Sequence, residues 1–242
     1  MADQEPRVAL LAGASGLVGG YVLDALLDAP DFSRVFAVTR RPLGREHSRL
    51  ANRIVQFEKL EAQLKGQTCH TAFCCIGTTM KQAGSQEAFR QVDLDYVVAI
   101  ARAARVAQAQ RFVVVSSAGA NPQSKNFYLR VKGEMEQALE ALQFPALDIL
   151  QPGPLLGWRR DLRPRELAIS LVMPLVNPLI GGANIPFRGI SARKVAAAAL
   201  GAARSGRRGV YRYTYTALVA LAASRPVRAN PPSNPKVQSG AR

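Results

Sequence analysis

A tyrosine and a lysine four positions apart, Tyr128 and Lys132, are the residues of this sequence best suited to acid–base chemistry. They lie in a segment with helical spacing, so their side chains project from one face of a helix, one turn apart. A lysine ammonium beside a tyrosine favours the phenolate and lowers the pKa of the hydroxyl from its usual value of about 10. Such a tyrosine can pass a proton to or from a substrate oxygen. The spacing alone is common on protein surfaces, so its meaning depends on its surroundings.

Two adjacent serines provide a second candidate for catalysis. Ser116 and Ser117 end the apolar run RFVVVSS, residues 111–117, which is predicted to be a strand. Open α/β sheets bind ligands at the carboxyl ends of their strands, so a hydroxyl there could hold a reacting oxygen. The serines precede Tyr128 by 12 and 11 positions. Which of them faces the substrate stays open, although Ser117 is preferred because it directly precedes the small Ala-Gly-Ala turn.

A glycine-rich turn near the amino terminus gives these residues a context. In VALLAGASGLVGGYVLDAL, residues 8–26, Gly13, Gly16 and Gly19 follow an apolar strand and open a helix. Glycines so placed permit a tight turn, close approach of the backbone to a pyrophosphate, and close packing of the helix on the sheet. The helix N-terminus then offers free N–H groups to the phosphates. The strand before and the helix after favour a dinucleotide-binding turn over a bare strand-to-helix turn.

The end of the second predicted strand indicates which dinucleotide would bind. An acidic residue about 20 residues after the turn would hydrogen-bond the adenine ribose hydroxyls and favour NAD. This sequence has Arg40 and Arg41 there instead. Because guanidinium groups pair bidentately with phosphate, the two arginines favour the 2′-phosphate of NADP(H) over NAD(H). The alternative is a pair of solvated surface arginines.

Alternating strands and helices must position these residues. Strands are expected at 8–13, 35–40, 53–57, 71–77, 111–117 and 146–153, and helices at 17–29, 86–109, 126–142, 165–176 and 191–203, before a last strand and helix in 209–223. Apolar strands that are each followed by a helix predict an α/β fold of Rossmann type, a doubly wound parallel sheet with helices on both faces. We expect one domain over residues 1–223, with a small substrate-covering region at about 153–190. The proline-rich residues 224–242 are expected to form a disordered tail.

Together these residues resemble the short-chain dehydrogenase/reductase superfamily in its extended or atypical form. The resemblance is narrower, to the branch related to the Tat-interacting-protein-type oxidoreductase and its bacterial relatives, in FCCIGTT (73–79), VSSAGA (115–120), YLRVKGEME (128–136) and QPGPLLGWR (151–159). It covers about residues 6–223. The sequence departs from the superfamily in the loop after the fourth strand, which reads Cys-Cys-Ile-Gly-Thr-Thr, and in the short interval between the serines and Tyr128.

The resemblance implies an NADP(H)-dependent oxidoreductase that transfers hydride to or from a carbonyl or alcohol. In its catalytic set Lys132 binds the nicotinamide ribose, Tyr128 is the acid/base, and Ser117 or Ser116 orients the reacting oxygen. The residues that it implies for cofactor binding are Gly13, Ser15, Gly16, Leu17, Gly19, Arg40, Arg41, Cys74, Gly77, Thr78 and Pro152. We expect a lipophilic or acidic carbonyl substrate. A nucleotide-sugar epimerase or dehydratase and a non-catalytic NADPH-sensing regulatory or scaffold protein stay open as alternatives.

Composition limits the other classes of function. The three cysteines and two histidines provide neither a disulfide framework nor zinc-ligand spacing, so we expect buried reduced thiols and no metal site. Residues 151–242 carry 15 Lys and Arg against 2 Asp and Glu, but the arginines are scattered without interleaved aromatics, which disfavours nucleic acid as a partner. The polar start and the absence of an apolar run of about 18 residues indicate a cytoplasmic protein without a membrane span. The substrate, the reaction direction and the oligomeric state, including a homodimer, stay open.

Overall fold

The computed structural model describes residues 7–156 and 187–224, and its central element is a parallel sheet of seven strands. The strands are β1 (Arg7–Ala12), β2 (Phe32–Thr39), β3 (Leu50–Ile54), β4 (Thr71–Cys74), β5 (Arg111–Val115), β6 (Ala146–Leu150) and β9 (Gly209–Tyr213). Their order across the sheet is β3-β2-β1-β4-β5-β6-β9. The order reverses between β1 and β4, which is the switch point of a doubly wound sheet. The predicted Rossmann-type fold class is confirmed.

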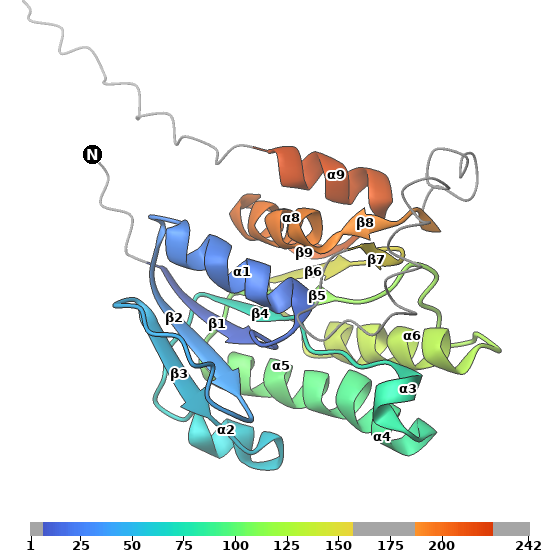
Figure 1. Ribbon diagram of the computed structural model, residues 1–242, viewed down its shortest axis with the longest axis horizontal. Coiled ribbons are helices and arrows are strands. Elements are labelled where there is room, and N and C mark those ends of the chain that lie inside the picture. Colours follow the sequence, from blue (N-terminus) through green and yellow to red (C-terminus); the bar gives the residue numbers. More distant parts are fainter. Residues whose placement is uncertain (1–6, 157–186, 225–242) are drawn as a thin grey trace, which may run out of the picture.

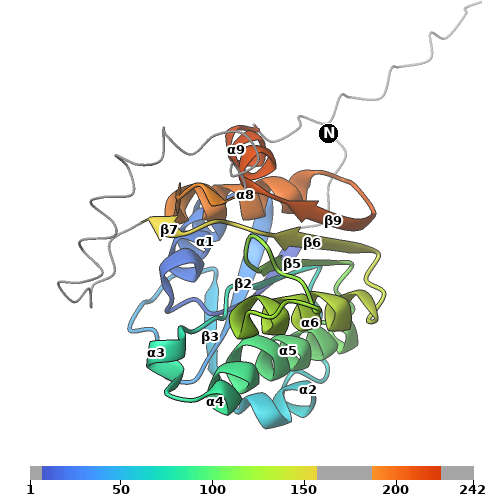
Figure 2. The ribbon, with the colours of Figure 1, turned by 90° about the vertical axis from the view of Figure 1, so that its right-hand side faces the viewer.

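Helices cover both faces of this sheet (Figures 1 and 2). They are α1 (Leu17–Asp28), α2 (Leu60–Gln63), α3 (Met80–Ala83), α4 (Gln86–Arg90), α5 (Tyr96–Val106), α6 (Phe127–Glu140), α8 (Ala192–Arg204) and α9 (Tyr215–Ala223). One face carries α5 and α6, and the other carries α1 and α8, with α9 packed on the outside of α8. The short strands β7 (Leu155–Leu156) and β8 (Ile190–Ser191) form a separate parallel pair.

The alternation of side chains along the strands separates the core into two layers. In β5, Phe112 and Val114 belong to the layer beneath α5 and α6. Val113, between them, belongs to the layer beneath α1 and α8. Successive side chains of a strand point to opposite faces, so a strand buried on both faces is apolar throughout. This explains why the apolar runs of the sequence predicted the sheet.

Two predicted elements differ from the structure in an informative way. The strand expected at 53–57 lies three residues earlier, since Leu50 to Ile54 pair with β2. Val55, directly after β3, and Phe57, in the short 3₁₀ helix η1 (Phe57–Lys59), are buried in the core without belonging to the strand. The helix expected at 86–109 is interrupted by the π-helical turn η2 (Gln91–Asp95) between α4 and α5. π-Turns of this kind occur frequently at functional sites.

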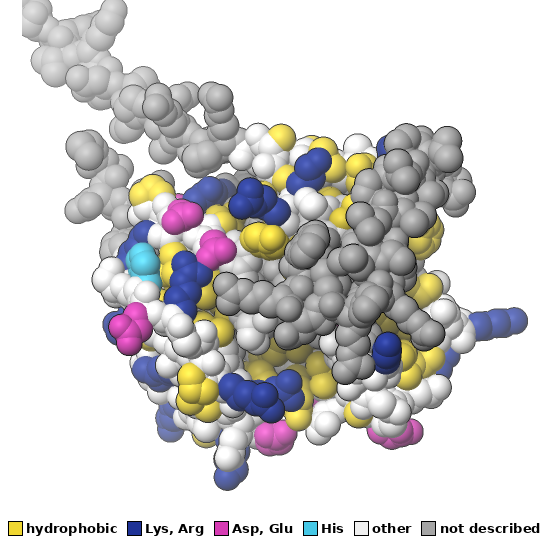
Figure 3. Space-filling view, in the orientation of Figure 1, with side chains coloured by type: hydrophobic (Ala, Val, Ile, Leu, Met, Phe, Trp, Pro, Cys, Tyr) yellow, Lys and Arg dark blue, Asp and Glu magenta, His cyan; other side chains and the backbone are white. Residues whose placement is uncertain are grey.

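Some expectations lie outside the described residues: the helix at 165–176, most of the substrate-covering region and nearly all of the tail. Among residues 7–156 and 187–224, no helix is both long and apolar enough to cross a membrane. On the face drawn in Figure 3, Lys and Arg side chains stand in separate groups among hydrophobic and other side chains. The described residues that are visible on this face therefore form no continuous basic patch.

Candidate functional site

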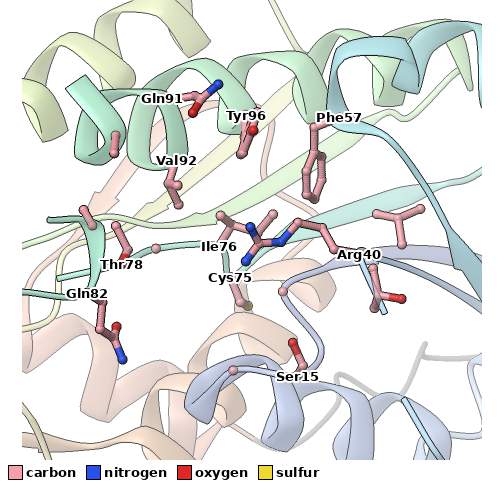
Figure 4. Close-up of a pocket in the computed structure, with 17 residues that line it drawn as sticks. Ser15, Arg40, Phe57, Cys75, Ile76, Thr78, Gln82, Gln91, Val92 and Tyr96 are labelled. Atoms are coloured by element: carbon pink, nitrogen blue, oxygen red, sulfur yellow. The ribbon is translucent and has the colours of Figure 1, made fainter. Parts of the chain in front are cut away.

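A cleft of about 590 Å³ opens at the carboxyl ends of β1, β2 and β4, where the strand order reverses. Its floor is the glycine-rich turn, and its sides are the end of β2, the loop after β4, and the helical segments α3, α4 and η2 with the start of α5 (Figure 4). The predicted residues that line it are Gly13, Ser15, Gly16, Arg40, Gly77 and Thr78. Ligands of open α/β sheets bind in this position.

The glycine turn is compact because two of its positions admit no side chain. Gly13 has φ +87°, and a Cβ on it would lie 2.6 Å from the carbonyl carbon of Cys75. A Cβ on Gly19 would lie 2.0 Å from the oxygen of Gly13, so α1 rests directly on the turn. The N-cap residue Gly16 is exposed, and no side chain caps α1. The first N–H groups of α1 are thus open to the cleft, as a bound pyrophosphate requires.

The two arginines at the end of β2, Arg40 and Arg41, have different surroundings in the structure. The side chain of Arg40 lies in the cleft (Figure 4), and no carboxylate pairs with it among the described residues. Arg41 is exposed and is absent from the cleft lining. A guanidinium without a counter-ion fits an anionic group of a ligand. Arg40 is therefore the better placed of the two for a phosphate.

An aromatic wall, which the sequence did not reveal, stands beside Arg40. Phe57 and Tyr96 line the cleft and stack with their ring centroids 4.8 Å apart. The Tyr96 hydroxyl donates to Glu58 Oε1 at 3.0 Å, and burial together with this carboxylate raises the pKa of Tyr96. The two rings come from η1 and α5, which are distant in sequence. A flat apolar wall of this kind suits a planar base.

Lys132 lies behind the loop after β4 as part of a buried ion pair. Its Nζ is 2.7 Å from Asp93 Oδ1, and both side chains are almost wholly buried. Burial, the largest single effect, would lower the pKa of Lys132, but the charge and hydrogen bond of Asp93 together with the neighbouring Tyr128 and Cys74 raise that pKa above its usual value. The other carboxylate oxygen, Asp93 Oδ2, accepts the backbone N–H of Thr78 at 2.8 Å. Asp93 could have been suspected from the sequence, because it is the acid on the apolar face of the helix expected at 86–109.

Tyr128 stands one turn before Lys132 on α6. It is half-buried, and its ring packs against Phe89 of α4 with centroids 5.6 Å apart. The helix begins after Asn126, whose side chain accepts the N–H of Leu129. The prediction that Tyr128 and Lys132 share a helix agrees with the structure. Neither residue lines the cleft itself; α6 packs on η2, whose Gln91 and Val92 do.

The two candidate serines point in different directions. Ser116 is buried, and its hydroxyl donates to Glu136 on α6. Ser117 is half-buried, and its hydroxyl contacts only the carbonyl oxygen of Ala118, at 3.3 Å, among the described residues. Since Ser116 continues the side-chain alternation of Phe112 and Val114, it points into the layer beneath α6. Ser117 keeps a hydroxyl that is available to a ligand.

Glu136 joins the ends of three strands to α6. Besides Ser116 after β5, it accepts Nε2 of Gln151 after β6, at 2.9 and 3.1 Å, and Nε of Arg212 from β9, at 3.0 Å. It lies on the same helix face as Tyr128 and Lys132, four residues beyond the lysine. A buried carboxylate with this many donors fixes the register of α6 on the sheet. In the sequence, the position of Glu136 four residues after Lys132 already indicated that the two side chains share a helix face.

A close backbone contact holds the serine loop against the same helix. A Cβ on Gly133 would lie 2.2 Å from the carbonyl carbon of Asn121, so the loop after β5 touches α6 directly. On the other side of the serines, the N–H of Ala118 donates to the carbonyl oxygen of Pro152 at 2.9 Å. Pro152 itself is buried. It therefore supports the serine loop and does not line the cleft.

The remaining predicted residues support the cleft from below. Leu17 is the first residue of α1. Cys74 is buried, and burial raises its pKa to about 12; burial also raises the pKa of Cys75, which lines the cleft. All three cysteines are free thiols; Cys69 and Cys74 are buried, as expected, whereas Cys75 is only partly buried. Within the described parts of the chain, no group of three His, Cys, Asp or Glu side chains could hold a metal.

Known proteins are similar to this chain in sequence. The family described as NAD(P)H-binding matches residues 13–157, more than half of the chain. Protein HTATIP2 of Rattus norvegicus is 39% identical over 160 residues, which are 64% of this chain and 66% of that protein. Protein FMP52, mitochondrial, of Saccharomyces cerevisiae is 37% identical over 155 residues, 63% of this chain and 67% of that protein. The chain thus spans about two thirds of the length of these relatives, and the cytoplasmic location expected from the sequence stays a prediction.

Solved structures show the same fold at low sequence identity. MoeE5 in complex with UDP-glucuronic acid and NAD has a TM-score of 0.65 and 19% identity, over 85% of this chain and 76% of that one. A UDP-N-acetylglucosamine 4-epimerase from Methanobrevibacter ruminantium M1 has a TM-score of 0.65 and 18% identity, over 87% and 77%. Both support the Rossmann-type architecture. The chain belongs to the NAD(P)H-binding family, as its glycine turn and switch-point cleft already indicated.

Proposed function

We propose that this protein is an oxidoreductase of the short-chain dehydrogenase/reductase type that uses NADP(H) in preference to NAD(H). The observation that carries the proposal is the position of Lys132, directly behind Gly77 at the wall of the cleft, with Tyr128 one turn away on the same helix face. A nucleotide in the cleft would thus meet the ammonium, and a substrate beside it would meet the tyrosine. The bound cofactor would supply the hydride.

The side chains of the chain would handle the proton and the reacting oxygen. Tyr128 would give its hydroxyl proton to a carbonyl oxygen in reduction, or accept a proton from an alcohol in oxidation. Ser117 would hold that oxygen by a hydrogen bond, because its hydroxyl is not engaged by a side chain among the described residues. Lys132 would hold the nicotinamide ribose. Ser116 would support the loop from below through Glu136.

The preference for NADP(H) is supported by Arg40. Its guanidinium lies in the cleft without a carboxylate partner in the described residues, at the end of β2 where the adenine ribose of a dinucleotide binds. NADPH and NADH titrations, followed by nucleotide fluorescence, test this for wild type, Arg40→Ala and Arg41→Ala. We expect Arg40→Ala to weaken NADPH binding by roughly 10- to 100-fold, as the loss of a charge-assisted hydrogen bond implies. NADH binding should change less than about twofold.

Controls make the titration decisive. Arg41→Ala should have a smaller effect than Arg40→Ala, and Arg102→Ala, an exposed arginine on α5, should have none. Equal affinity for the two nucleotides, unaffected by Arg40→Ala, would overturn the NADP(H) preference. Failure of both nucleotides to bind would overturn the oxidoreductase proposal.

Turnover tests the chemistry. Lipophilic and acidic carbonyl compounds are offered with NADPH, and Tyr128→Phe should abolish any oxidation of the nucleotide while leaving NADPH affinity within about threefold. Unchanged turnover in Tyr128→Phe would rule out the tyrosine as acid/base. Conversion of a UDP-sugar without net change of the nucleotide would instead favour an epimerase, the activity named for one of the similar structures.

A further inference from the structure

We propose that Asp93 is a positioning residue of this site, one that holds Lys132 charged and ties it to the loop after β4 that a bound nucleotide touches. This proposal rests on the proposed function only in giving Lys132 a nucleotide to contact. Asp93 itself does not reach the reacting atoms, because it is wholly buried behind the loop. It would act through the lysine and through the backbone of Thr78.

The π-turn places this carboxylate where a helix face is otherwise apolar. Asp93 lies in η2, between α4 and α5, and its neighbour Leu94 is also buried. Asp95, two residues later, is exposed. Burying a carboxylate is unfavourable unless it is paired and hydrogen-bonded. Asp93 meets that condition with one ammonium and one backbone N–H from two separate elements.

Gly77, which lines the cleft, is the residue that separates the buried ion pair from it. A Cβ on Gly77 would lie 3.3 Å from Asp93 Oδ1 and 3.9 Å from Lys132 Nζ, so a side chain there would cover the pair. Asp93 Oδ1 is also the one buried side-chain oxygen or nitrogen in the described residues that accepts or donates no well-aligned hydrogen bond. An ammonium has three donors, and Asp93 is the only carboxylate paired with this one in the described part of the chain. The pair therefore retains capacity for a ligand hydroxyl.

The charge of Asp93 is what allows Lys132 to stay protonated. The groups that face the ammonium are Asp93 from η2, Tyr128 from α6 and Cys74 from β4. Only Asp93 among them is ordinarily negative at neutral pH. If its charge is removed while its shape is kept, the buried ammonium loses its counter-ion and releases its proton at lower pH. Lys132 would then become a neutral amine in the range where the protein is assayed.

The first test observes the lysine directly, without nucleotide or substrate. Lysine labelled with ¹³C at Cε is incorporated, and the Lys132 signal is assigned by its absence in Lys132→Arg. The midpoint of its titration should fall by at least two pH units in Asp93→Asn relative to wild type. The matched control is Asp95→Asn, the exposed acid of the same π-turn, which should leave the midpoint unchanged. A midpoint in Asp93→Asn equal to that of wild type overturns the proposal.

The second test is NADPH titration at pH 6.5 and pH 9. The ratio of the wild-type NADPH affinity to the Asp93→Asn affinity should increase at least fivefold from pH 6.5 to pH 9. The reason is that Lys132 loses its proton over this interval only in the variant. The double variant Asp93→Asn/Lys132→Arg should remove this growth, since arginine keeps its charge. Asp93 acting only as a structural residue would weaken binding equally at both pH values, and that result contradicts the proposal.

A third variant tests whether a nucleotide approaches the ion pair through Gly77, without changing the charge of Lys132. It also keeps the proposal testable if Asp93→Asn does not fold. Gly77→Ala should weaken NADPH binding at least fivefold and leave the Lys132 titration unchanged. Retention of full NADPH affinity in Gly77→Ala would contradict the placement of the pair at the cleft wall. If wild type binds no NADPH, the proposed function fails, whereas the Lys132 titration still decides the role of Asp93.

Discussion

Two buried ion pairs of this molecule have the same chemistry and opposite surroundings. Lys132 and Asp93 meet directly behind Gly77, a residue of the cleft wall. Arg111 and Asp148 meet inside the fold, with Arg111 at the amino end of β5. In both pairs the carboxylate is essentially inaccessible, at 1% and 0% of its exposed area. Burial and charge therefore do not distinguish them.

Their partners do distinguish them. Arg111 also donates to the carbonyl oxygens of Ala202 and Arg207, and the second oxygen of Asp148 accepts the Tyr213 hydroxyl at 2.8 Å. This network closes on itself and joins β5, β6 and β9 to the end of α8. The pair at the cleft leaves an oxygen without an aligned donor. A fully satisfied buried network specifies structure, whereas an incompletely satisfied one beside a cleft points to a ligand.

The largest expected effect is the loss of the arginine in the closed network. Arg111→Met leaves Asp148 buried without its counter-ion and removes a donor from the carbonyl oxygens of Ala202 and Arg207. We expect the free energy of unfolding to fall by about 3–5 kcal/mol, measured by urea denaturation. NADPH affinity of the folded protein should stay within about twofold. A large loss of NADPH affinity in Arg111→Met without a loss of stability would contradict the structural role of the Arg111–Asp148 pair.

Removal of the lysine at the cleft should have a smaller effect on stability and a larger one on binding. In Lys132→Met, Asp93 keeps the N–H of Thr78, so the free energy of unfolding should fall by about 1–3 kcal/mol. NADPH affinity should fall by about tenfold or more, which corresponds to about 1.4 kcal/mol. The control is Lys125→Met, an exposed lysine before α6, which should change neither quantity. Equal losses of stability in Lys132→Met and Arg111→Met would remove the distinction.

The smallest effect is expected for an ion pair near the surface. Burial would raise the pKa of Asp31, but the hydrogen bond and charge of Arg204 and the charge of Arg7 hold it below its usual value. An acid whose pKa is lowered in the folded state stabilises the fold above its ordinary pKa of about 3.9, and this contribution is lost as the pH falls. Wild type should therefore lose a few tenths of a kcal/mol more than Asp31→Asn between pH 6 and pH 3.5 in urea denaturation. A larger acid loss in the variant would contradict this sign.

The sequence was sufficient for the parts of the site that one segment determines. Gly13, Gly16 and Gly19 lie within a single turn, and Tyr128 and Lys132 lie on a single helix, so local spacing predicted both arrangements, while the catalytic roles of Tyr128 and Lys132 stay predictions. The family resemblance and the parallel sheet follow from the same local patterns and are confirmed, whereas the helix expected at 86–109 is interrupted by η2 and that at 165–176 lies outside the described residues.

The parts that the sequence did not reveal depend on contacts between distant segments. Asp93 acquires its partners from α6 and from the loop after β4, and Glu136 acquires its partners from three strands. The aromatic wall forms because η1 meets α5. Spacing along the chain contains no information on such pairs, although an acid on an apolar helix face is a signal to search for one. The difference between Ser116 and Ser117 follows from strand alternation, which a register argument could have supplied.

Gly133 places the loop that carries Ser117 and the helix that carries Tyr128 in direct backbone contact. As homologous sequences diverge, the loop after β5 and helix α6 can change position only together, because the contact at Gly133 leaves no room for a side chain between them. Relatives that acquire different substrates must therefore change elsewhere, for example around Phe187, whose ring approaches Gly119 at the edge of the same loop. Among homologues, we expect substitutions to accumulate at that edge while the glycine and the loop it touches stay fixed.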